Sequence, residues 1–124
     1  MTSRYLAVLA AGALFALSPL AHAADAAAGQ AVFKSKCMTC HSDQKGTNKI
    51  GPSLFGVVGR ATGSEAGYKY SDPVSNLKTS WTPELLDKWL TKPADVAKGT
   101  KMTFPGLPNQ ADRDNVIAYL GTLK

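Results

Sequence analysis

Side chains that commonly bind transition metals are scarce in this sequence of 124 residues, which has two histidines, two cysteines and three methionines. Charge is modest as well, with 14 basic against 9 acidic residues. The lysines stand singly rather than in runs, which excludes the basic arm expected of a nucleic-acid-binding protein. No apolar run reaches the roughly 20 residues that cross a bilayer. Length and composition therefore predict one small domain with few candidate site residues.

The N-terminus has the pattern of a secretory signal. Arg4 provides a positive start, residues 6–17 are apolar or small, and Ala21-His22-Ala23 has the small-x-small form of a cleavage site. The sequence thus predicts a signal peptide over residues 1–23, a mature domain over residues 24–124, and a periplasmic location.

Cleavage after Ala23 would have a chemical consequence. It would remove Met1 and His22, so that His41 is the only histidine of the mature domain and Met38 and Met102 are its only methionines. Any metal site would have to be built from these few donors.

The pattern of the mature domain predicts an all-α fold with long loops and no strand. Helices are expected from an Asp25 cap to about Lys36, from a Thr82 cap with Pro83 at the first position until just before Pro93, and from about Asn109 or Gln110 to Thr122. A short helix is expected to begin at 71–73. Residues 42–70 and 97–109 are rich in glycine, proline and polar residues and predict loops. A loop of nearly thirty residues is unusual in a compact domain unless it wraps something.

The motif with the most chemical meaning is Cys37-Met38-Thr39-Cys40-His41. Cys-x-x-Cys-His is the attachment signal for a c-type haem. Each thiol can add to one vinyl group of the same porphyrin, while His41 offers its imidazole to the iron. A covalently held porphyrin would also supply apolar core that this short chain lacks.

Three other interpretations of the cysteines are weaker. A thioredoxin-like pair belongs to an alternating β/α chain, which the pattern does not show. A structural zinc ion needs a fourth ligand, and after cleavage neither a third cysteine nor a second histidine remains. A disulfide between Cys37 and Cys40 would close too small a loop to stabilise much and would leave His41 unexplained.

With haem present, the second axial ligand follows by elimination. Met38 lies inside the attachment loop and cannot reach the opposite face of the porphyrin. Met102 remains, in a segment whose Pro105 and Gly106 could hold a sulfur against the iron. The alternative is that Met102 only fills the core.

These features together resemble class I cytochrome c, of the mitochondrial type and its bacterial periplasmic relatives. The resemblance covers almost the whole mature domain. It implies a small single-haem cytochrome c fold, in which the N- and C-terminal helices cross near Gly29 and Tyr119 and long loops surround the haem. The matching motifs are Gly29-x-x-x-Phe33, Cys37-x-x-Cys40-His41, Gly51-Pro52-x-Leu54, Gly59-Arg60, Gly67-Tyr68-x-Tyr70, Trp81, Pro93, Gly99-Thr100-Lys101-Met102 and Ile117-Ala118-Tyr119-Leu120.

The resemblance also implies roles for single residues. The carbonyl of Pro52 would accept a hydrogen bond from the haem-bound imidazole, which fixes the ring and raises its basicity. Leu54, Leu90 and Phe104 would be apolar haem contacts. The residues expected around the haem propionates are Arg60, Tyr68, Tyr70, Trp81 and Thr100.

Two positions depart from the family pattern. Trp89 stands where many relatives have a tyrosine that hydrogen-bonds the methionine sulfur, and an indole N–H can only donate. An asparagine common in relatives falls on Val74 by direct count, with Asn76 two residues later. Hydrogen bonding on the methionine side of the haem should therefore differ from that of relatives.

The function implied is single-electron transfer by a monomeric carrier, not catalysis. His/Met ligation leaves no open iron position for a substrate and raises the reduction potential. Acidic-faced redox proteins, including respiratory or photosynthetic membrane complexes docked transiently, are the expected partners, steered by Lys36, Lys49, Lys98 and Lys101. The alternative is that the scattered lysines form only a solvated surface. Two alternatives stay open: a haem enzyme or ligand sensor with a displaceable Met102, and a subunit of a larger oxidoreductase.

Overall fold

The computed structural model describes residues 11–13 and 23–124. The predicted signal peptide, residues 1–23, falls almost entirely outside this range. Within it there are helices but no strand, and this confirms the all-α prediction. The helices are α1 (Ala26–Lys36), α2 (Asp72–Ser75), α3 (Pro83–Thr91), α4 (Pro93–Val96) and α5 (Gln110–Gly121).

The three longer helices begin at the caps that the sequence predicts. The side chains of Asp25, Thr82 and Asn109 each accept hydrogen bonds from backbone N–H groups of the first turn that follows. Such groups have no partner inside the helix, so the cap decides where the helix begins. The one-turn helix α4 was not predicted. Pro93 both ends α3 and occupies the first position of α4, and one turn is too short to show a helical periodicity.

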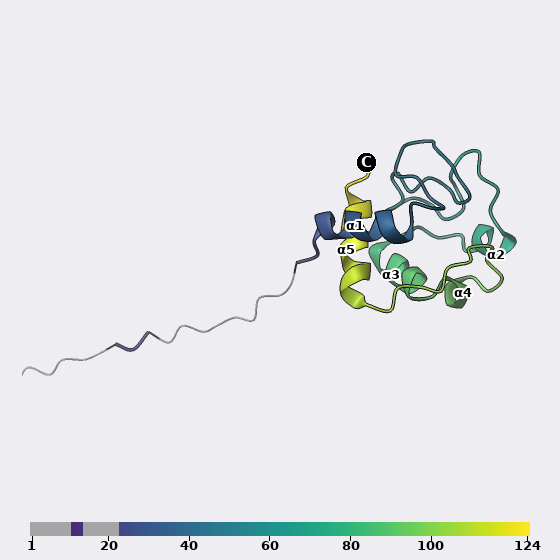
Figure 1. Cartoon of the computed structure of the whole chain (residues 1–124). Coiled ribbons are helices and arrows are strands. Elements are labelled where there is room, and N and C mark those ends of the chain that lie inside the picture. The colour runs from purple at the N-terminus through teal and green to yellow at the C-terminus, as the bar shows by residue number, and fades with distance from the viewer. Residues whose placement is uncertain (1–10, 14–22) are drawn as a thin grey trace, which may run out of the picture.

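Helices α1 and α5 cross at one end of the folded domain (Figure 1). The crossing is closest where Gly29 meets the backbone of Asn115 and Val116: a Cβ atom at position 29 would lie 1.8 Å from the Asn115 carbonyl oxygen. Only glycine allows so close an approach. One turn further on, the rings of Phe33 and Tyr119 pack with centroids 5.5 Å apart. The crossing expected near Gly29 and Tyr119 is therefore present, with its tightest point at Asn115.

The long loop of residues 42–70 is held by hydrogen bonds to distant parts of the chain rather than by regular structure. The backbones of Gly59 and Arg60 pair with Trp81, and Ala61 forms an isolated bridge with Ser80. On the other side of the domain α3 packs against both α4 and α5 (Figure 1). None of the helices in the described ranges combines the length and apolar character that a membrane crossing requires.

Candidate functional site

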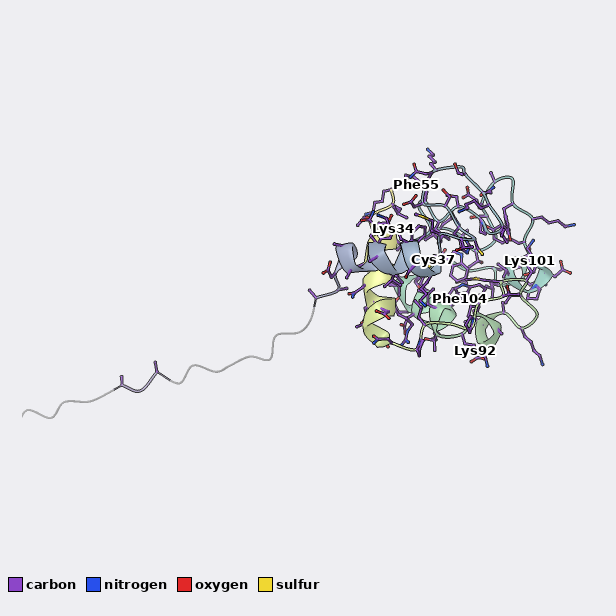
Figure 2. All side chains as sticks on the ribbon, viewed as in Figure 1. Lys34, Cys37, Phe55, Lys92, Lys101 and Phe104 are labelled. Atoms are coloured by element: carbon purple, nitrogen blue, oxygen red, sulfur yellow. The ribbon has the colours of Figure 1, made fainter. Side chains whose placement is uncertain are left out.

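A mainly apolar cavity of about 400 Å³ lies between the end of α1, the long loop, α3, α5 and segment 97–109. Figure 2 shows two of its lining residues, Cys37 and Phe104, near the middle of the folded domain, with Phe55 and Lys92 at its edges. The cavity brings together every site residue named from the sequence: Cys37, Cys40, His41, Pro52, Leu54, Arg60, Tyr68, Tyr70, Trp81, Trp89, Thr100, Met102 and Phe104.

His41 is buried and its ring is held on two sides. Its Nδ1 lies 2.7 Å from the Pro52 carbonyl oxygen. A carbonyl can only accept, so Nδ1 carries the proton and Nε2 keeps its lone pair. A Cβ atom at Gly51 would lie 2.4 Å from Cε1 of the ring, so only glycine fits beside it. Burial lowers the pKa of His41, against the effect of the Pro52 bond, and the charges of Arg60 and Lys49 lower it further. The imidazole is therefore neutral near pH 7, as a metal ligand must be.

The two cysteines follow directly on α1. Cys37 caps the C-terminal end of the helix, and the backbone N–H of His41 donates back to the Cys37 carbonyl, so the pair and the histidine form one tight turn. Burial, and to a smaller extent the neighbouring Cys40, raises the pKa of the Cys37 thiol to about 11. A disulfide oxidoreductase needs a thiol with a lowered pKa. The environment of Cys37 thus argues against the thioredoxin-like interpretation.

Segment 97–109 places half-buried Met102 on the cavity wall and is held near its C-terminal end. There the Leu107 N–H donates to the Leu90 carbonyl of α3 at 2.7 Å. Buried Arg113 of α5 donates to the carbonyls of Leu107 and Pro108, and also to the carboxylate of Asp87 in α3 at 2.8 Å. No local signal in the sequence marks Arg113 for this role.

Lys101, next to Met102, ties the segment to the long loop. Its ammonium nitrogen lies 4.7 Å from the centroid of the Tyr68 ring and donates to the Lys69 carbonyl. Two surface segments that border the cavity are joined in this way, although they are distant in sequence.

The polar wall of the cavity contains donors that the protein itself leaves without a partner. Among the described residues, no hydrogen-bond partner exists for the buried Nε of Arg60 or the buried hydroxyl of Ser71. The hydroxyl of Tyr70 accepts from the Glu65 N–H at 3.0 Å, which leaves its own proton to donate. Tyr68, in contrast, already donates to the Ile50 carbonyl at 3.1 Å.

The model of the family described as "Cytochrome c" matches residues 26–124, which is nearly all of the folded domain. The chain belongs to the cytochrome c family. Proteins of this family are electron carriers rather than enzymes and hold haem c covalently. The chain therefore carries one haem c, attached through Cys37 and Cys40, and transfers electrons.

Individual relatives support the same assignment. Cytochrome c2 of Rhodopila globiformis is 48% identical over 102 residues, which cover 81% of this chain and 94% of the relative. Cytochrome c of Euglena viridis is 45% identical over 100 residues, covering 81% of this chain and 98% of the relative. The solved structure of cytochrome cH from Methylobacterium extorquens superposes with a TM-score of 0.74 at 41% identity and covers 79% of this chain and 98% of its own.

The cavity fits a haem on grounds that do not depend on these relatives. Its walls are mainly apolar, as a porphyrin requires, and the thiols of the attachment motif line it. Arg60 and Ser71, each of which has a buried donor without a partner, are among the residues that line the cavity. Buried donors need acceptors, and the two carboxylates of a haem are acceptors.

Several lining residues were missed by the sequence analysis. Ile50 and Ser71 line the cavity, as do buried residues of α3 and α5. Val74 rather than Asn76 occupies the cavity wall, and Asn76 is an exposed cap of α2. The apolar spacing of α3 and α5 could have indicated Leu86, Val116 and Leu120, whereas no local signal marks Ser71.

Proposed function

We propose that the chain is a periplasmic single-electron carrier in which His41 and Met102 are the two axial ligands of the haem iron. The observation that carries the proposal is that one cavity is lined by both cysteines, by His41 and by Met102. Bound haem c supplies a one-electron couple between ferric and ferrous iron. The chain's own residues hold the haem and set its reduction potential.

The state of His41 supports its role. Since Nδ1 donates to Pro52, only Nε2 can bind a metal, and the short bond fixes the ring plane before any metal is present. Met102 is the one methionine that lines the cavity, among the residues the structure describes. Its thioether is a soft, neutral donor that favours ferrous iron.

The remaining site residues divide by chemistry. We infer that Leu54, Leu90 and Phe104 pack on the porphyrin and exclude water, which disfavours the more charged ferric state. The haem propionates would be surrounded by side chains that supply hydrogen-bond donors or a positive charge, namely those of Arg60, Tyr70, Trp81 and Thr100. Tyr68 would contribute its ring and its bond to Ile50 rather than a donated proton. Trp89 packs edge-on against Trp81, with ring centroids 5.1 Å apart, and lines the same cavity as Met102.

The ligand assignment is tested by absorption spectroscopy of the purified holoprotein. Oxidised wild-type protein should show the weak far-red band that arises from a sulfur–ferric iron bond. Met102→Leu should abolish this band while the covalently bound haem is retained. Met38→Leu is a matched control, because Met38 is exposed and does not line the cavity. Persistence of the band in Met102→Leu would reject the assignment and bring the enzyme or sensor alternative forward.

Docking to acidic redox proteins is supported by the surface near the cavity mouth. Lys36, Lys49, Lys98 and Lys101 are exposed. Lys36 and Lys101 also line the cavity, as does Ile50, which is 76% exposed and offers an apolar contact. The ammonium groups of Lys49 and Lys101 are held by backbone carbonyls, so their charges have defined positions. An apolar centre with positive charge around it suits a transient acidic partner.

The docking proposal predicts a charge-dependent rate of electron transfer. With ferricyanide as an anionic oxidant, the second-order rate should fall as salt is added, and Lys36→Gln should lower it further. Lys92→Gln is the control, because Lys92 pairs with Asp95 and lies at the lower edge of the folded domain in Figure 2, away from Lys101. A rate that is independent of salt would exclude electrostatic steering.

Periplasmic processing is tested separately by the mass of the protein recovered from a periplasmic extract, which should begin at Ala24 and include one haem. Elution as a single chain from gel filtration would support a free shuttle, and co-elution with other subunits would support the larger oxidoreductase.

A further inference from the structure

Arg60 on the cavity wall forms an ion pair whose charge balance bears on electron transfer. Arg60 Nη1 lies 2.8 Å from Glu65 Oε2, and each side chain is only 15% exposed. By comparison, the pair Lys92–Asp95 is largely exposed at 3.7 Å. Arg60 lines the cavity whereas Glu65 does not. Glu65 therefore contacts Arg60 from outside the cavity lining.

The nitrogen atoms of the Arg60 guanidinium group differ in their hydrogen bonds. Nη1 donates to the carbonyls of Ser53 and Phe55 and to the carboxylate of Glu65. Nε, which is buried, has no partner among the residues described. Glu65 thus holds one end of the group, and Nε makes no competing bond. The backbone N–H of Glu65 also donates to the hydroxyl of Tyr70, another lining residue.

We propose that Glu65 is a positioning residue that sets the reduction potential, because it orients Arg60 and compensates its charge at the cavity wall. The inference rests on the proposed function only in that the haem occupies this cavity.

The direction of the effect follows from electrostatics. Ferric haem carries one more positive charge than ferrous haem, and it gains one electron from an external mediator on reduction. An uncompensated Arg60 beside it disfavours the ferric state. A nearby charge that is poorly solvated acts more strongly than an exposed one, since the effective dielectric constant is lower. Removing the Glu65 charge should therefore favour reduction.

The test is a mediated redox titration of the full-length holoprotein. Glu65→Gln keeps the size and one acceptor but removes the charge, and it should raise the equilibrium constant for reduction by about 3-fold to 10-fold. For a one-electron couple a tenfold change corresponds to about 59 mV. Glu65→Asp, which keeps the charge, should stay nearer to wild type. Asp95→Asn removes an exposed carboxylate of another ion pair and should leave the potential almost unchanged.

The outcomes separate this proposal from the axial-ligand assignment. If the far-red band persists in Glu65→Gln and the potential rises relative to Asp95→Asn, the proposal stands. An unchanged or lower potential, or an equal rise in Asp95→Asn, would overturn it while leaving His41 and Met102 assigned. If Glu65→Gln does not accumulate as holoprotein, Glu65→Ala provides the second test: it should also raise the potential relative to Asp95→Asn, and an unchanged or lower potential would overturn the proposal.

Discussion

The substitution Gly29→Ala should destabilise the crossing of α1 and α5 although it adds only one methyl group. The new Cβ would lie 1.8 Å from the carbonyl oxygen of Asn115 and 2.9 Å from the amide nitrogen of Val116. Both are backbone atoms of a helix and cannot swing away. Ordinary contact begins at 3.4 Å, so the helices would have to separate by about 1.6 Å, and even a gap of about 1 Å forfeits up to about half of each dispersion contact.

The magnitude follows from the interactions at the crossing. Overpacking costs about 3 kcal/mol at the upper end of its usual range. Separation also strains the bonds from Asp25 to Asn115 and from Tyr119 to Asp43, together about 1 kcal/mol or more. Alanine returns about 1 kcal/mol through its helix propensity. The net loss should be about 3 kcal/mol, which lowers the melting temperature of a domain of this size by about 10 to 20 °C.

Denaturant unfolding of the holoprotein measures this loss. Gly121→Ala is the matched control. Position 121 lies in α5, the other helix of the crossing, and a Cβ atom there would meet nothing within 4 Å. It should be neutral or stabilise by up to about 1 kcal/mol. Equal unfolding midpoints for the two variants would refute the reasoning from close approach.

Two further predictions concern side-chain bonds of α5. The Tyr119 hydroxyl donates to Asp43 at 2.7 Å and holds the pKa of that carboxyl below its usual value; the stabilisation is therefore present above about pH 4 and is lost as the pH falls below it. In Tyr119→Phe, the urea midpoint of unfolding should therefore fall less than in wild type as the pH is lowered from neutral to acidic. An unchanged pH profile would contradict the stabilising role of the Tyr119–Asp43 bond. Arg113→Met leaves two carbonyls and Asp87 without their donor and should cost about 2–4 kcal/mol in the same assay. Lys92→Met, which breaks an exposed pair, should cost under about 1 kcal/mol, and a similar loss in both variants would show that the Arg113 bonds contribute little.

Short sequence motifs were sufficient to predict haem attachment and the starts of the longer helices. The attachment motif spans five residues, and the caps at Asp25, Thr82 and Asn109 act on the first turn that follows each of them. Helix starts and the haem-binding turn depend on neighbours in sequence and can be read directly. The scarcity of histidine and methionine then leaves few candidates for the axial ligands.

Other parts of the site depend on partners that are distant along the chain. The choice of Val74 rather than Asn76 for the cavity wall was decided by the short helix α2, which turns Asn76 to solvent. The link from Arg113 to Asp87, 26 residues away, arises because α3 and α5 pack together.

The sequence by itself determined that the chain is a helical haem protein, because attachment, capping and periodicity are short-range properties. Only the tertiary structure decided which polar groups face the cavity and which charges compensate one another. Glu65 illustrates the difference: its carboxylate reaches Arg60, five residues earlier, across an irregular turn of the long loop, and such a turn leaves no periodic pattern in the sequence.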